Sequence, residues 1–381
     1  MRLSRNFRKL SINKRREQIQ TTFDLSLSID ELENSQKILE TADAMIENAA
    51  GVFSVPLGFV PELIVNNKSY TIPMATEEPS VIAAASFVST IINRHSGVSA
   101  FGAPAIMSEQ IFLTRYNSNT VSEIQELEEE IFSLSHNLLA SMEKRGGGLE
   151  KVQATAINDS ILKVELFVNV CDAMGANILN TLGELLGPWL AEKTKTSLLM
   201  AILSNSGESR ISTAEFSIPL EDLGRNGKTG SEITQRILQA SEVAQLDPER
   251  AVTHNKGIMN GVLALVLATG NDTRAVESAV HYHASIKGKY TALSNYTLKN
   301  GILTGKIELP IPVALVGGAV QFHQTAVNNL KILGVTSVSE LSAVTAALGL
   351  VQNFAALFAL VSEGIQKGHM KLHEKKKLNE S

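Results

Sequence analysis

The sequence predicts an α+β protein in which a small split-βαβ (ferredoxin-like) domain with one antiparallel sheet is inserted into a large, mainly helical domain. Within residues 106–209 the hydrophobic pattern switches repeatedly between the two-residue period of strands and the 3.6-residue period of helices. Much of the sequence outside this stretch has helical periodicity. With 381 residues, 44% of them hydrophobic and 19% charged, the chain is long enough for two or three packed domains.

The first hundred residues predict a helix, a hairpin and a second helix. Apolar residues recur at helical spacing from Ile29 to Asn48, and Gly51 follows as a stop signal. From Phe53 to Pro73 short apolar runs are separated by prolines and by the turn signal Asn66-Asn67, which favours a hairpin. Pro79 is suited to the first turn of a helix that continues to about Arg94.

The middle of the chain predicts six alternating elements. In order they are strand 110–116, helix 121–142, strands 151–156 and 161–170, helix 173–191 and strand 197–203, with Gly146-Gly147-Gly148 in the first loop. This β-α-β-β-α-β order is that of a split-βαβ sandwich, with two helices on one face of an antiparallel sheet.

The last third is mostly helical. Asp247-Pro248 opens the helical stretch, Asn300-Gly301 signals a hairpin between 290–298 and 302–309, and residues 338–366 predict a long apolar helix. Its segment Ala343–Val361 is long enough to cross a membrane, but Gln352 and Asn353 lie at its centre. We therefore expect a buried core helix.

Charge and cysteine content exclude several function classes. The net charge is −5, and the basic residues crowd at the two ends of the chain, so no nucleic-acid partner is expected. Cys171 is the sole cysteine, which excludes an internal disulfide and suits a reducing cytosol. The N-terminal charges are not followed by an apolar run, so we expect a cytoplasmic protein without a signal peptide or a membrane anchor.

The sequence has neither a strand-anchored G-x-G-x-x-G nor a Walker motif. A nucleotide would therefore be held by another segment, and the candidate is Asp172–Asn177, which follows a strand and opens a helix. The alternative is that Asp172 caps this helix and that the small residues serve close packing.

Four further segments carry polar groups that could perform acid–base chemistry: 77–80, 253–257, 270–272 and 368–370. Between them they supply a lysine, carboxylates and a histidine, which could stabilise an oxyanion and transfer protons. Each alone could equally be a surface charge or a helix cap. His254, His281 and His283 have no cysteine or carboxylate partner nearby in the sequence, so we expect surface histidines and no metal site.

Taken together, the motifs resemble those of hydroxymethylglutaryl-CoA reductase of the bacterial class II type. The matching segments, in the same order, are 47–51 with 55–58, 73–80, 172–177, 253–260, 268–272 and 363–370. The resemblance runs from about Phe7 to His373. It implies an NAD(P)H-dependent oxidoreductase that interconverts 3-hydroxy-3-methylglutaryl-CoA and mevalonate plus CoA, with the split-βαβ domain binding the cofactor.

The resemblance also implies roles for individual residues. The positions that match catalytic residues are Glu78, Lys256, Asp272 and His369. Those that match substrate-binding residues are Arg8, Ser80, Asn205, Arg250 and Gln352. The cofactor-binding positions are Asp172, Met174, Gly175, Ala176 and Asn177. The implied cofactor is NADPH or NADH, with the determinant of preference near His136, and CoA enters as part of the substrate, without a metal. A homodimer with its active site at the subunit junction is implied as well.

The domain boundaries expected from pattern and resemblance are 1–105 and 210–367 for the large domain and 106–209 for the small one. Residues 368–381 are expected to be a short basic tail, the remnant of a closing domain. A weakly active or inactive truncated homologue that binds CoA thioester, and a helical acyl-CoA carrier without redox function, are the alternatives. Lys256 and Asp272 are sixteen positions apart, roughly 24 Å along a straight helix. The chain must therefore bend, at Gly261 or Gly270.

Overall fold

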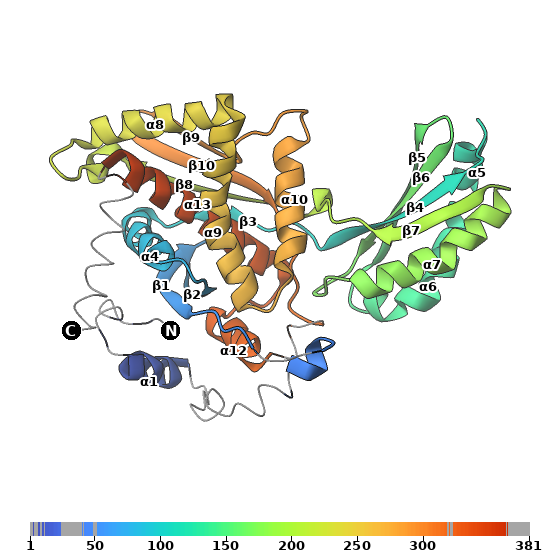
Figure 1. Ribbon diagram of the computed structural model, residues 1–381, viewed down its shortest axis with the longest axis horizontal. Coiled ribbons are helices and arrows are strands. Elements are labelled where there is room, and N and C mark those ends of the chain that lie inside the picture. Colours follow the sequence, from blue (N-terminus) through green and yellow to red (C-terminus); the bar gives the residue numbers. More distant parts are fainter. Residues whose placement is uncertain are drawn as a thin grey trace.

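The computed structural model describes residues 3, 7, 10, 12–23, 40, 42–48, 52–317, 320, 323–362 and 364. A large body of helices and strands surrounds helix α13, and a smaller body with one four-stranded sheet stands to one side of it (Figure 1). Each body has its own main hydrophobic cluster, and a third, small cluster joins Leu3, Phe7 and Ile19 to Ile332 of the large body.

The smaller body has the predicted split-βαβ topology. Its elements are β4 (Ile106–Thr114), α5 (Thr120–Glu126), α6 (Glu128–Glu143), β5 (Gly148–Asn158), β6 (Ile161–Asn169), α7 (Ala176–Lys193) and β7 (Ser197–Leu203). The strands lie in the order β5-β6-β4-β7, and every neighbouring pair is antiparallel. The predicted fold class is confirmed, whereas the domain boundaries remain a prediction.

Two helices of the smaller body differ from the prediction. The single helix expected over 121–142 is two helices, because the helical conformation is interrupted at Leu127, between α5 and α6. The helix expected to begin at residue 173 begins at Ala176, since Gly175 before it has a φ of 84°. Residues of β6 alternate between buried and half-buried, as expected for a sheet with helices on one face.

The large body combines a hairpin, a mixed-order sheet and a group of long helices. The hairpin is formed by β1 (Leu57–Val65) and β2 (Lys68–Ala75), and helix α4 (Val81–Ile92) follows it. The sheet has the order β3-β8-β10-β9, with bounds Ser99–Phe101, Ile211–Pro219, Ile302–Pro310 and Ser294–Lys299. The remaining long helices are α1 (Ile12–Phe23), α8 (Gly230–Leu246), α9 (Pro248–Ala268), α10 (Thr273–Ser285), α12 (Gln324–Leu333) and α13 (Val338–Ser362).

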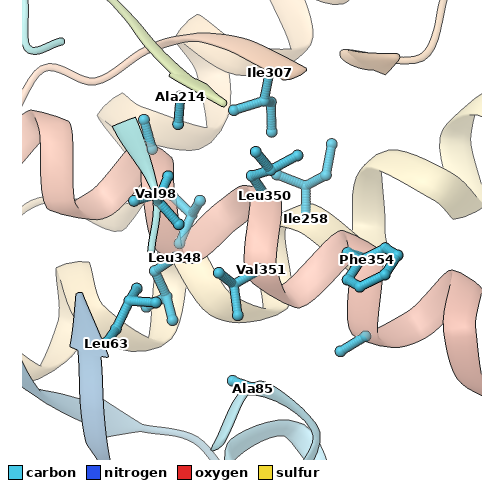
Figure 2. Close-up of a cluster of buried hydrophobic side chains, with 14 of the residues drawn as sticks. Leu63, Ala85, Val98, Ala214, Ile258, Ile307, Leu348, Leu350, Val351 and Phe354 are labelled. Carbon is cyan, nitrogen blue, oxygen red and sulfur yellow. The ribbon is translucent and has the colours of Figure 1, made fainter. Parts of the chain in front are cut away.

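Helix α13 is the centre of the large core. Figure 2 shows Leu348, Leu350, Val351 and Phe354 of this helix among apolar side chains of the surrounding elements. By length and composition α13 could cross a membrane, but 83% of its most apolar window is buried inside the protein. The predicted core helix is confirmed.

Several expectations are confirmed and others are not. The hairpins at Asn66-Asn67 and Asn300-Gly301 and the helix after Pro79 are present. The sequence interpretation missed β8, which pairs along its whole length with β10, and placed no separate helix at α8. The predicted helix 29–48 and the tail 368–381 lie largely or wholly outside the described residues.

Candidate active site

The site centres on an ion pair between Lys256 and Glu78. Lys256 stands on α9 and Glu78 lies in the loop between β2 and α4, and the Nζ and Oε2 atoms are 2.7 Å apart. The backbone N–H of Glu78 donates to the Thr76 hydroxyl, which fixes this loop. Both side chains remain open to solvent, with exposed fractions of 59% for Lys256 and 37% for Glu78. The structure thus brings together two groups that are 178 positions apart in the chain.

The sequence of α9 places Lys256 firmly. Asp247 caps the helix by accepting from Glu249 N–H, and Pro248 occupies its first turn, where no N–H is needed. Farther along, α9 passes so close to α13 that a Cβ on Gly261 would be 2.8 Å from Gln352 Cβ. Glycine at this position lets the two helices approach, and brings Gln352 to the helix that carries Lys256.

Three of the predicted substrate-binding residues have buried polar atoms that lack partners. These atoms are Ser80 Oγ, Arg250 Nη1 and Gln352 Oε1, and no hydrogen-bond partner is present for them in the described part of the chain. Buried polar groups are normally hydrogen-bonded, and each unsatisfied one costs about 1–3 kcal/mol. A guanidinium donor, a hydroxyl and an amide acceptor together suit a ligand that bears a carboxylate and a hydroxyl group.

The backbone at Ser80 is strained as well. Ser80 precedes α4 with a φ of 79°, a left-handed conformation that is rare for residues other than glycine, and its side chain makes no capping bond. Such strain is retained mainly at functional sites, because the surrounding structure must over-determine it.

A buried polar network, which the sequence interpretation missed, anchors α9 next to Lys256. His254 Nε2 lies 2.6 Å from Ser294 Oγ, and this hydroxyl donates to Asn353 Oδ1, which also accepts from Tyr296 OH. Asn255 accepts from Leu293 N–H and donates to the Thr291 carbonyl. The pair of amides Gln352-Asn353 inside an apolar helix was the available signal for such a network.

The prediction that His254 is a surface histidine is wrong. Its side chain is buried, with 2% exposure, on the face of α9 that packs against the sheet and α13. Burial, together with the nearby Arg250 charge, lowers the pKa of His254 to about 4. The imidazole is therefore neutral at physiological pH.

Asp272 lies beyond the end of α9, where the chain turns. Gly270, with a φ of 70°, makes the turn, and α9 runs without a break through Gly261, so of the two predicted bending points only Gly270 is used. Asp272 caps α10 by accepting from the N–H groups of Arg274 and Ala275. No hydrogen bond or ion pair among the described residues joins Asp272 to Lys256 or Glu78.

The predicted cofactor segment 172–177 forms the turn before α7. Asp172 does not cap α7, so that part of the alternative is wrong, whereas close packing is found at Gly175, where a Cβ would be 2.4 Å from Val170 Cγ1. Its Oδ1 accepts from Val338 N–H at the start of α13, 166 positions away. Gly175 is the N-cap of α7, and no side chain caps the helix there. Within the described part of the chain no side-chain cap is present at this helix end, which fits an anionic group of a dinucleotide there.

Among the described residues, the remaining predicted site residues have no hydrogen bond or ion pair to this centre. Asn205 is exposed in the loop after β7, and within the described ranges no hydrogen bond links it to the ion pair. Arg8 and His369 lie outside the described residues.

Comparison with known proteins decides the family. The sequence model of the hydroxymethylglutaryl-coenzyme A reductase family matches residues 11–374. The chain belongs to this family. Among curated reductases it is 40% identical over 374 residues to that of Archaeoglobus fulgidus, covering 96% of this chain and 84% of the relative. It is 36% identical to the probable reductase of Borreliella burgdorferi, covering 100% of this chain and 87% of the relative.

Solved structures of the class II reductase from Streptococcus pneumoniae are similar over nearly the whole chain. One is 40% identical with a TM-score of 0.90 and covers 98% of this chain and 91% of its own. Another, described as bound to NADPH in open conformations, is 39% identical with a TM-score of 0.89 and covers 94% of this chain and 100% of its own. The expected class II reductase, an NAD(P)H-dependent oxidoreductase acting on hydroxymethylglutaryl-CoA, is confirmed, and the inactive homologue is not favoured.

Proposed function

We propose that the Lys256–Glu78 centre is where this reductase converts the thioester of 3-hydroxy-3-methylglutaryl-CoA to mevalonate and CoA, with NADPH as the reductant. The proposal is supported by the ion pair at 2.7 Å and by unsatisfied buried polar atoms on Ser80 before α4, Arg250 on α9 and Gln352 on α13. A catalytic site requires a reactive pair of groups and, beside it, polar groups that are available to hydrogen-bond the substrate.

The unsatisfied groups define how the substrate is held. Arg250 pairs with the free carboxylate of the hydroxymethylglutaryl group, and Ser80 and Gln352 complete its hydrogen bonds. Asn205, in the loop after β7, contacts the same group from the side of the smaller body, and Arg8 contacts the CoA phosphates. Binding then satisfies the groups that are left without partners in the described residues, so the cost of burying them is recovered in the complex.

Lys256 stabilises the negative charge that develops on the thioester oxygen when hydride reaches its carbon. The resulting hemithioacetal collapses to mevaldehyde, and the CoA thiolate that leaves takes a proton from His369. A second hydride reduces mevaldehyde, and the carboxyl group of Glu78 supplies the proton for the new hydroxyl. Asp272, at the N-terminus of α10, adjusts the charge of the site. The contact between an ammonium and a carboxylate at Lys256 and Glu78 supports the roles proposed for this pair.

The segment 172–177 holds the dinucleotide, which supplies the hydride when bound. The lack of a side-chain cap at the start of α7, within the described residues, supports this assignment. NADPH is the cofactor described for the pneumococcal relative, and NADH is the alternative.

We propose further that the protein is a cytoplasmic homodimer with the active site at the subunit junction. An exposed apolar group on residues 45–57 supports a partner surface: Met45, Ile46, Val52, Phe53 and Leu57. Phe53 is 94% exposed, which is unfavourable for an aromatic side chain unless another subunit covers it.

The proposal is tested by following nicotinamide absorbance with hydroxymethylglutaryl-CoA, using NADPH and NADH in parallel. We expect thioester-dependent oxidation with a higher kcat/KM for NADPH. Acetyl-CoA is the matched control, because it carries the same thioester but no carboxylate for Arg250, and it should give no reaction. Absence of thioester-dependent oxidation with both nucleotides would refute the proposal.

A further inference from the structure

Arg210 is a buried cation that has no carboxylate partner among the described residues. It lies where the chain returns from the smaller body to β8, and its side chain is 2% exposed. Burial lowers the pKa of Arg210 to about 10, so the guanidinium stays charged. Among the described residues it forms no ion pair, and its Nε has no partner. Removing an unpaired charge from water is unfavourable, so we expect Arg210 to have a role that an apolar side chain could not perform.

The guanidinium joins the cofactor segment to a second stretch of chain, residues 311–316, which we call the strap. Its Nη1 donates to the Val313 carbonyl at 2.8 Å and its Nη2 to the Ala173 carbonyl at 3.4 Å. The backbone of the two stretches is joined as well, because the Asp172 carbonyl accepts from Leu315 N–H and Val316 N–H.

The strap continues to the catalytic aspartate. Ala314 N–H donates to Asn271 Oδ1 at 2.7 Å, and Asn271 directly precedes Asp272. Asn271 is held in turn by its Nδ2, which donates to Thr269 Oγ1. An unbroken series of hydrogen bonds therefore runs from Ala173 through Arg210 and the strap to the residue before Asp272.

We propose that Arg210 is a positioning residue for the reduction: it fixes the cofactor segment relative to Asp272 through the strap. The inference rests on the proposed function, in which segment 172–177 binds the dinucleotide. Because a trans peptide is planar, the bond from Arg210 to the Ala173 carbonyl turns the Met174 N–H to the opposite side. Two nitrogens of one rigid, planar group bond this peptide and the strap, whereas the donors of a lysine ammonium all rotate on one nitrogen and would not fix this geometry.

The test compares Arg210→Lys and Asn271→Ala with the parent chain. NADPH binding is measured by nucleotide fluorescence, thioester turnover by absorbance, and folding by thermal unfolding. For Arg210→Lys we expect the NADPH dissociation constant to rise by about tenfold or more and kcat to fall. The KM for the thioester should stay within about threefold, because Ser80, Arg250 and Gln352 stand on other elements.

Asn271→Ala breaks the series at its other end. It should lower kcat by about tenfold while NADPH binding stays within about threefold, since the Arg210 contact to Ala173 remains. Arg236→Met, on the exposed face of α8, is the matched control and should change neither quantity. If Arg210→Lys fails to fold, Asn271→Ala still tests the proposal. Unchanged turnover in Asn271→Ala would show that the strap does not couple the cofactor segment to Asp272 and would overturn the proposal.

Two results separate this inference from the proposed function. Gly175→Val distorts the cofactor segment itself, so if it leaves NADPH binding intact, the assigned segment is wrong and both proposals fall. If Gly175→Val weakens NADPH binding but Arg210→Lys binds NADPH like the parent chain, the inference alone is overturned. A rise of both the thioester KM and the NADPH dissociation constant, in step with a lower Tm, would also overturn it, because it would show a merely structural role.

Discussion

Replacing Lys256 with alanine should separate catalysis from stability. The ion pair with Glu78 is short but solvent-exposed on both sides, and such pairs stabilise a fold by about 0.2–1 kcal/mol. Loss of one preorganised group that stabilises an oxyanion costs about 2.7–4 kcal/mol of transition-state stabilisation. Lys256→Ala should therefore lower kcat by about 100- to 1,000-fold, while the free energy of unfolding changes by less than about 1 kcal/mol.

The chain offers a matched control for this variant. Lys306 on β10 pairs with Glu215 on β8 at the same 2.7 Å, with similar exposed fractions of 62% and 44%. Lys306→Ala removes an equivalent ion pair and should leave kcat unchanged. The assays are NADPH oxidation with the thioester and urea unfolding of each variant. Turnover of Lys256→Ala close to that of Lys306→Ala would refute the role assigned to Lys256.

Three further predictions follow from other residues. Gln352→Leu removes a buried unsatisfied amide and should raise the thioester KM by about tenfold, while Tm stays unchanged or rises. A lower Tm in thermal unfolding with an unchanged KM would contradict this. Burial and the Glu184 carboxylate raise the pKa of Glu109 to about 8, so this group contributes stability that is fully present below its unfolded pKa and lost as pH rises toward 8. Glu109→Gln should therefore be more stable than the parent chain at pH 8. This difference in the free energy of unfolding should shrink by up to about 1.4 kcal/mol per pH unit as the pH is lowered toward 4.5. Denaturant unfolding at a series of pH values measures the difference, and a pH-independent value would argue against a buried ionising carboxyl. Phe53→Glu should convert the proposed dimer to monomer in sedimentation, and a variant that sediments like the parent would place the dimer contact elsewhere.

The smaller body was predictable because its signals are local. Alternating buried residues in β6 and the apolar period of α7 report directly which face meets the core, and the order of elements then leaves few topologies. Lys256 and Glu78 could be proposed as catalytic residues from the order of the motifs, and the structure places their side chains in contact.

Features that depend on distant contacts could not be predicted. Asp172 was expected either to bind a nucleotide or to cap its own helix; it caps α13 and not α7, and its nucleotide-binding role stays a prediction. His254 has the neighbours of a surface histidine in the sequence, but its environment is made by Ser294 and Asn353 from other elements. The strain at Ser80 and the buried charge of Arg210 likewise depend on tertiary packing, which no local pattern encodes.

The central claim is that a single centre, built on Lys256 and Glu78, carries both reductions. The most direct measurement is the ratio of NADPH oxidised to free CoA thiol released during complete conversion of hydroxymethylglutaryl-CoA. We expect two molecules of NADPH for each thiol, with no mevaldehyde accumulating. A ratio of one, with mevaldehyde left in solution, would show that this centre performs only the first reduction.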